Sequence, residues 1–139
     1  MAVGGAVSRY RIASEANDID GIMQTLAPDV AVVSPISGRM VFRGHDDVRV
    51  LLTAVYSSLS ALRWREEAGA GTVHVVVGDA RVGPLRLGDA MVLHLADDGR
   101  IRRIRPHLRP WLALTLLALK LGPTIARRPG LVRRALRRT

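Results

Sequence analysis

The chain of 139 residues has no cysteine and only five phenylalanine, tyrosine and tryptophan residues. The absence of cysteine excludes disulfide bonds and thiolate metal sites. Long hydrophobic runs are also missing. The longest, residues 111–121, is interrupted by Thr115 and Lys120 and covers only about half of the ~20 residues that a membrane-spanning helix requires. The first seven residues lack the basic start of a secretory signal. We therefore expect a soluble, cytoplasmic protein with a single hydrophobic core.

Acidic residues are missing from the C-terminal part of the chain, because all twelve lie at or before Asp98. Residues 1–98 carry nine arginines against these twelve carboxylates, a net charge of −3. Residues 99–139 carry eleven arginines and one lysine, a net charge of +12. Clustered positive charge of this kind indicates an anionic partner. We expect one domain over residues 1–108, followed by a basic helical tail over residues 109–139.

Hydrophobic periodicity predicts an α+β fold with an antiparallel sheet. A first helix is expected over residues 8–26, ended by Pro28, with Gly21 either weakening the helix or dividing it into two. A second helix begins at Gly44, where acidic residues in its first turn complement the helix dipole. The expected strands are two short ones, at 30–33 and 40–43, and four long ones, at 62–69, 72–82, 85–96 and 100–108.

This order of elements resembles the nuclear-transport-factor-2-like superfamily, and within it the ketosteroid isomerases and the SnoaL-like polyketide cyclases. The resemblance covers residues 8–108 and rests on the segments VVSP at 32–35, FRGHD at 42–46 and DGRI at 98–101. It implies a cone-shaped, curved antiparallel sheet wrapped around the N-terminal helices, with one deep pocket. It also implies a homodimer formed through the sheet.

The resemblance to ketosteroid isomerases carries over only in part. Tyr10 matches the tyrosine that donates a hydrogen bond to the dienolate oxygen, but Ser34 stands where those enzymes have the catalytic aspartate. A serine without an activating base cannot remove a carbon-bound proton near neutral pH. Counting back from the Gly99 turn puts Gly88 at the second oxyanion donor and Asp89 on the opposite strand face, unless a β-bulge shifts the register. The resemblance therefore disfavours ketosteroid isomerase chemistry.

Other members of the superfamily suggest other acids and bases. SnoaL-like cyclases use a histidine and an aspartate, and His74 matches a position that lines the pocket, so His74 and Asp89 are candidates beside Tyr10. Trp64 either lines the pocket or fills the core. The four histidines have no ligand spacing, so we expect no metal site and no cofactor. Members of the superfamily that resemble limonene-epoxide hydrolases use an arginine between two aspartates. The residues that could form such a set here are Asp79, Asp89, Arg65 and Arg81.

The tail has two parts. Residues 111–121 are apolar on nearly every side, which predicts a helix that closes the open end of the cone or packs on a partner subunit, and that ends at Pro123. Residues 131–136 then predict a short amphipathic helix with one apolar side and one basic side, as in helices that lie on anionic membranes. Nucleic acid is disfavoured, because no stacking platform or reading motif accompanies the charge. The candidate anion contacts are Arg127, Arg128, Arg133, Arg134, Arg137 and Arg138.

Two functions are compatible with these features. The first is a SnoaL-like enzyme of the isomerase, cyclase or hydrolase type, acting on an apolar polycyclic or polyketide-like ligand, with Ser34, Trp64 and Gly88 lining the pocket. The second is a non-catalytic ligand-binding or interaction module held at an anionic membrane by its tail. If Tyr10, Ser34 and His74 converge on one cavity, the enzyme is favoured over the binding module.

Overall fold

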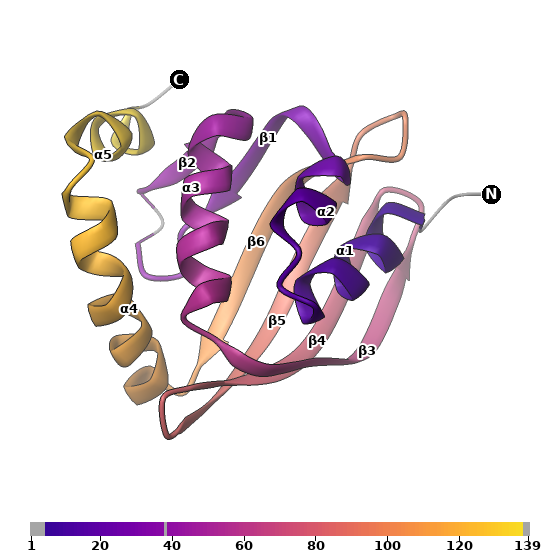
Figure 1. Cartoon of the computed structure of the whole chain (residues 1–139). Coiled ribbons are helices and arrows are strands. Elements are labelled where there is room, and N and C mark those ends of the chain that lie inside the picture. Colours follow the sequence, from indigo (N-terminus) through magenta and orange to yellow (C-terminus); the bar gives the residue numbers. More distant parts are fainter. Residues whose placement is uncertain (1–4, 38, 138–139) are drawn as a thin grey trace.

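A computed structural model describes residues 5–37 and 39–137 of the chain (Figure 1). Within these residues the helices and strands follow one another in a mixed order that begins and ends with a pair of helices. The elements are α1 (Gly5–Glu15), α2 (Ile19–Gln24), β1 (Leu26–Val33), β2 (Val41–Arg43), α3 (Gly44–Ser57), β3 (Ser60–Ala70), β4 (Val73–Val82), β5 (Leu85–Leu95), β6 (Ile101–Arg109), α4 (Trp111–Ala126) and α5 (Pro129–Leu136).

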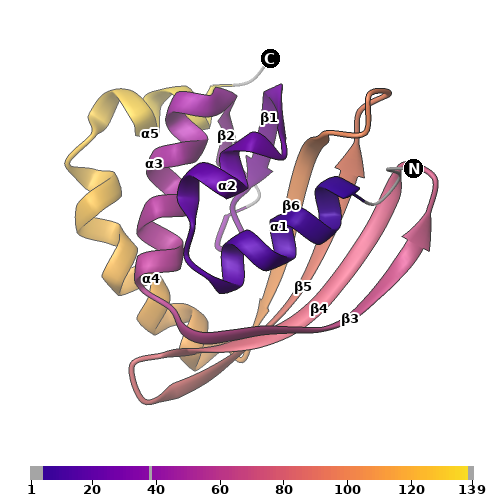
Figure 2. The ribbon, with the colours of Figure 1, turned by 45° about the vertical axis from the view of Figure 1, so that its right-hand side comes forward.

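One curved sheet organises the molecule, with the strand order β2-β1-β6-β5-β4-β3. Strands β3 to β6 are joined as antiparallel hairpins, whereas β1 pairs with β6 in parallel, so the prediction of a fully antiparallel sheet was wrong at that pair. The helices α1, α2 and α3 lie on the concave face (Figures 1 and 2). The α+β fold with C-terminal helices is confirmed.

The sheet is curved (Figure 2), and the pairing of β3 with β4 contains an irregularity of the kind that bends strands. The pairing between these strands shifts register between Trp64 and Glu66, as it does at a β-bulge. A Cβ atom at the neighbouring Gly78 would lie only 2.4 Å from the carbonyl oxygen of Arg63. Glycine therefore permits the close approach of the two backbones that the bend requires.

The N-terminal helix is interrupted earlier than the sequence indicates. The chain leaves α1 through Asn17, whose φ is 54°, and Asp18 then caps α2 by accepting a hydrogen bond from the Gly21 amide at 3.0 Å. The break thus precedes Gly21 instead of falling on it. Pro28 lies inside β1, next to an irregular part of the β1–β6 pairing, where a missing amide hydrogen is tolerated.

The tail packs against the rest of the chain along one edge of the molecule (Figure 2). In α4, Ala113, Leu117 and Leu121 are buried against Val82 and Leu87 at the end of the β4–β5 hairpin. Helix α4 continues through Pro123, contrary to prediction. Proline removes the bond to the carbonyl four residues earlier, at Leu119, which is on the exposed side where water can replace it. Within the described chain, no helix is both long and apolar enough to cross a bilayer.

Helix α5 is tied to the start of α3 by an ion pair. The Arg134 guanidinium donates from Nε and Nη2 to the two carboxylate oxygens of Asp47, at 2.8 and 2.9 Å. Leu131 and Ala135 of the same helix are buried in the main core. Such two-bond pairing fixes geometry as well as charge, so Arg134 is engaged within the chain, which argues against its predicted role as an external anion contact.

The outer face of the sheet carries no helix in the described part of the chain (Figures 1 and 2). Val73 and Val77 on this face are 42% and 36% exposed. The homodimer through the sheet stays a prediction.

Two leucines of α4 provide a matched test of how the tail is held. Leu117 is 1% exposed and Leu119 is 69% exposed. We expect Leu117→Ala to lower the free energy of unfolding by about 2 to 5 kcal/mol, because it leaves a void between α4 and the sheet. Leu119→Ala should change it by less than about 0.5 kcal/mol. Urea denaturation of both variants measures the difference, and equal losses would show that α4 is not packed as described.

Candidate functional site

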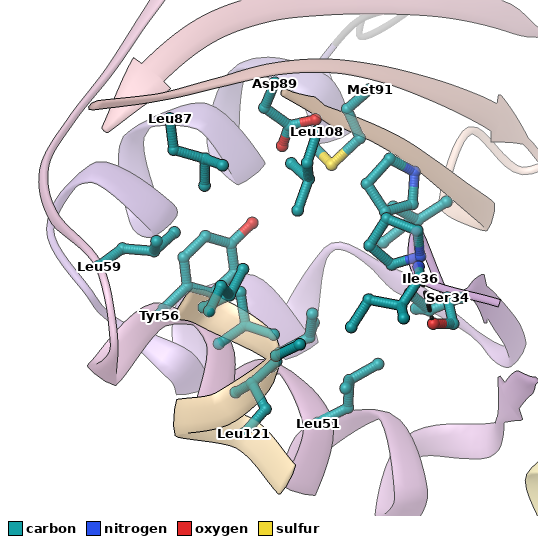
Figure 3. Close-up of a pocket in the computed structure, with 18 of the residues that line it drawn as sticks. Ser34, Ile36, Leu51, Tyr56, Leu59, Leu87, Asp89, Met91, Leu108 and Leu121 are labelled. Carbon is teal, nitrogen blue, oxygen red and sulfur yellow. Dashed lines mark hydrogen bonds between the residues drawn. The ribbon is translucent and has the colours of Figure 1, made fainter. Parts of the chain in front are cut away.

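A cavity of about 210 Å³ lies between the concave face of the sheet and the helices α3 and α4 (Figure 3). Its wall is almost entirely apolar. The sheet contributes Leu87, Met91, Ile104 and Leu108, and the helices contribute Leu51, Leu52, Leu117 and Leu121. Such a wall selects an apolar ligand, and the few polar groups that reach it determine how the ligand is oriented.

Two aspartates line this cavity, namely Asp79, whose carboxylate is bound by Arg65, and Asp89. Asp89 is the one placed to act on a ligand. It lies on β5 between Leu87 and Met91, and its carboxylate faces the cavity (Figure 3). The Oδ1 atom is buried and has no hydrogen-bond partner among the described residues. Burial raises the pKa of Asp89 from 3.8 to about 7, although the backbone amide of His107 favours the ionised form. A carboxyl group in this state can either accept or donate a proton near neutral pH.

A pair of tyrosines forms the second polar feature. The hydroxyl groups of Tyr10 on α1 and Tyr56 on α3 are 2.7 Å apart, and both rings are buried. Burial raises the pKa of both hydroxyls, and the negative charge of Asp89 raises them further. Both therefore remain protonated. Because only one hydroxyl hydrogen lies between the two oxygens, the pair keeps a second hydrogen that it can donate to a ligand.

Ser34 and Trp64 also line the cavity, but their polar atoms are occupied. The Ser34 hydroxyl oxygen accepts hydrogen bonds from the backbone amides of Ile36 and Ser37, at 3.2 and 3.3 Å, and so holds the turn after β1. The Trp64 indole donates to the Ser14 hydroxyl oxygen at 2.9 Å. Neither residue offers a base.

The register predicted for β5 was wrong. Asp89 faces the cavity, whereas Gly88 is not among the lining residues. Asp89 shares the inner face of β5 with the buried Leu87, Met91 and Leu93, and the pairing of β5 with β4 is regular. The β5–β6 pairing shifts by one residue between His94 and Leu95, but the extra residue lies on β6 and does not change the face of β5 that carries Asp89.

His74 does not line the cavity, which corrects its predicted position. It lies on β4 opposite Leu93, beyond the pairs that join the cavity-lining parts of β4 and β5. Its Nε2 atom is 3.2 Å from the carbonyl oxygen of Gly71, and its Nδ1 atom is 4.0 Å from the Glu67 carboxylate. His74 is thus held at the far end of the sheet and has no access to the cavity.

The alternative set of two aspartates and two arginines does not converge either. Arg65 donates to both carboxylate oxygens of Asp79, at 3.2 and 3.3 Å, and these side chains are partly exposed. Asp89 points to the opposite side of the sheet. No group of histidine and carboxylate side chains within the described residues is arranged to hold a metal ion.

Comparison with solved structures identifies the fold. An uncharacterised protein with a cystatin-like fold from Silicibacter pomeroyi is 23% identical, with a TM-score of 0.85 over 94% of this chain and 93% of that one. A steroid delta-isomerase from Pseudomonas aeruginosa is 22% identical, with a TM-score of 0.81 over 92% and 94% of the two chains. This is the nuclear-transport-factor-2-like fold.

Relatives of this fold also include a protein from Sinorhizobium meliloti provisionally assigned as a polyketide cyclase. It is 23% identical to this chain, with a TM-score of 0.63 over 74% of this chain and 94% of that one. No model of a known protein family matches the chain, and no curated protein matches its sequence. The cavity of this nuclear-transport-factor-2-like chain must therefore be interpreted from its own residues.

Tyr56 is the site residue that sequence reasoning did not single out. It lies in the apolar stripe of α3, and this pattern indicates a core residue. The available signal was its hydroxyl group, because a buried tyrosine hydroxyl needs a partner. Tyr10 was the only other tyrosine in the chain that could supply one.

The buried carboxyl group of Asp89 makes stability depend on pH. Its pKa rises from 3.8 to about 7 on folding, so the folded protein retains a proton that the unfolded chain loses. Stability should fall as the pH rises between these values, by a free energy on the order of 4 kcal/mol. Asp89→Asn removes this dependence, and we expect its melting temperature to exceed that of the native protein more at pH 8 than at pH 5.

Asp98→Asn provides a control of opposite sign. Arg100 lowers the pKa of Asp98, so the ionised form stabilises the fold, and this variant should lose stability at neutral pH but not at strongly acidic pH. Differential scanning fluorimetry across pH 3 to 8 measures both trends. A pH-independent difference between Asp89→Asn and the native protein would show that the carboxyl group is solvated.

Proposed function

We propose that this chain is a small-molecule enzyme of the isomerase or cyclase type that moves a proton next to a carbonyl group of an apolar ring compound. The observation that carries the proposal is Asp89, a carboxyl group with a buried, unpartnered oxygen on an otherwise apolar cavity wall. Burial of an ionisable group without a partner costs stability, and such groups concentrate at functional sites.

The cavity volume bounds the ligand. An engineered apolar cavity of about 150 Å³ binds benzene, and the cavity described here holds about 210 Å³. A compound with one or two rings fits this space. A four-ring compound requires the walls to move, which narrows the polycyclic substrate class expected from the sequence.

The two polar features divide the chemistry between them. With a pKa of about 7, Asp89 is ionised in about half of the molecules at neutral pH. The ionised carboxylate takes a proton from the carbon beside the ligand carbonyl. The electron pair of that C–H bond forms a carbon–carbon double bond, and the π pair of the carbonyl group moves to its oxygen. The free hydrogen of the Tyr10–Tyr56 pair bonds to the resulting enolate oxygen. Asp89 then returns the proton to the same or another carbon.

Enolisation of this kind is the step that isomerisation and aldol-type ring closure have in common. The solved structures that share the fold include a steroid delta-isomerase and a protein provisionally assigned as a polyketide cyclase. They support an enzyme of this general type without specifying its substrate.

A binding module without chemistry is the second candidate. One observation favours it. The hydroxyl of Ser34, which replaces the expected carboxylate, is occupied by backbone amides. Asp89 would then act only by fixing the orientation of a ligand through one hydrogen bond.

Bicyclic ketones test both functions. We expect 2-tetralone to bind more tightly than tetralin, which has the same ring system without the carbonyl oxygen, by about 5- to 100-fold in isothermal titration calorimetry. Tyr56→Phe should reduce this preference and leave tetralin binding nearly unchanged, since it removes a hydrogen donor and keeps the ring. Equal affinity of the native protein for the two compounds would contradict the polar role of the pair.

Proton transfer is measured separately from binding. In D₂O the native protein should accelerate exchange of the C1 hydrogens of 2-tetralone, followed by nuclear magnetic resonance, and Asp89→Asn should lose at least about 100-fold of that acceleration. Ser34→Ala is the matched control and should retain it. Binding of 2-tetralone without accelerated exchange would assign the protein to the non-catalytic class.

A further inference from the structure

The outward side of α4 exposes large apolar side chains. Trp111 is 74% exposed, Leu112 is 52% exposed and Leu119 is 69% exposed. Their spacing places Leu112 and Leu119 two turns apart on one side of the helix, opposite the buried Ala113, Leu117 and Leu121. Exposed apolar side chains gathered on one element usually mark a contact surface.

Basic side chains follow these apolar ones along the chain. Lys120 is exposed on α4, and four exposed arginines follow from the end of α4 to the end of α5. None of the four forms an ion pair within the described residues, unlike Arg134. Residues 99–139 contain no carboxylate side chain. The four arginines are Arg127, Arg128, Arg133 and Arg137.

We propose that the outward side of α4, together with these four arginines, is a docking surface for an anionic lipid bilayer. Trp111, Leu112 and Leu119 would insert between the lipid headgroups, while the guanidinium groups bind lipid phosphates. This combination of apolar and basic side chains suits the interface of an anionic membrane. Arg134 is excluded by its pairing with Asp47, and Arg138 lies outside the described residues.

Charge distinguishes the bilayer from a second copy of the chain. Two copies that met through this surface would bring two sets of unpaired arginines together, and like charges at an interface oppose association. A polynucleotide would satisfy the arginines but would leave the exposed leucines in water. An anionic bilayer, with charged headgroups outside and apolar chains beneath, accommodates both.

The same helix forms a wall of the cavity from its inner side. Leu117, Leu121 and Ile125 line the cavity, and Leu112 and Leu119 point away from it. A docked α4 would therefore separate the cavity from the lipid by one helix, about 10 Å across. Docking itself does not depend on what the cavity binds.

Tryptophan fluorescence and vesicle flotation test the proposal. The chain has two tryptophans. Trp64 is 6% exposed and hydrogen-bonded, and Trp111 is 74% exposed. Vesicles of phosphatidylcholine and phosphatidylglycerol should shift the emission to shorter wavelength, and Trp111→Phe should abolish the shift. Vesicles of phosphatidylcholine alone should bind at least about 100-fold more weakly.

Two variants with four substitutions each distinguish the effect of where the arginines lie from the effect of the net charge of the protein. Replacing Arg127, Arg128, Arg133 and Arg137 by Gln should weaken binding to the anionic vesicles by at least about 100-fold, given about fivefold for each basic residue near the surface. The control replaces four exposed arginines of the sheet by Gln, namely Arg81, Arg86, Arg103 and Arg105, and should weaken binding by less than about fivefold.

Three outcomes would overturn the proposal. The first is equal loss of binding in the two sets, which would assign the effect to net charge alone. The second is duplex DNA binding that outcompetes vesicles and is indifferent to Leu112→Gln/Leu119→Gln. The third is a concentration-dependent dimer, seen by analytical ultracentrifugation, that Leu112→Gln/Leu119→Gln dissociates without any vesicle binding by the native protein.

Discussion

The concave face of the sheet is largely apolar, and the rest of the structure depends on how that face is covered. Helix α1 contacts β3, α3 contacts β1 and β2, and α4 contacts β4, β5 and β6. The sheet curves around these helices, and the cavity is the space that they leave over its concave face. The register shift between β3 and β4 is an irregularity of the kind that bends strands.

Within this apolar space, the charge of Asp89 affects the protonation of the tyrosine pair. Ionisation of Asp89 raises the pKa of Tyr10 and of Tyr56, so the hydroxyl groups stay protonated while the carboxylate is charged. One side of the cavity can therefore accept a proton while the other keeps a hydrogen to donate. This division of roles needs no metal ion and arises from the low polarity of the surroundings.

Much of the fold followed from local patterns. The stripe of apolar residues in α3, the alternation in β3 to β5 and the Asp97-Asp98-Gly99 turn each agree with the structure. The parallel pairing of β1 with β6 was not predictable in this way, since no local pattern reports which distant strand lies alongside. The continuation of α4 through Pro123 depends on solvent access to one carbonyl, which is a tertiary property.

The site was predictable only in its parts. Tyr10 was found through a family resemblance and Asp89 through its residue type, but the face of β5 that carries Asp89 was counted from the Gly99 turn instead of from the buried Leu87, Met91 and Leu93. An error of one residue in a strand directs every side chain to the other face. For His74 the predicted face of the strand is the inner one, as in the structure. Its position along β4, however, lies beyond the residues that line the cavity.

The walls of the cavity are drawn from Tyr10 near one end of the chain to Ile125 near the other. The hairpins β3 to β6 join neighbours in sequence and can form early, whereas Ala31 pairs with Arg103 across about half of the chain. On the ribosome, the part of β4, β5 and β6 that α4 covers therefore stays exposed until α4 emerges, and exposed apolar surface makes incompletely folded chains prone to aggregate. Helix α4 covers this surface only after β3 to β6 have been synthesised.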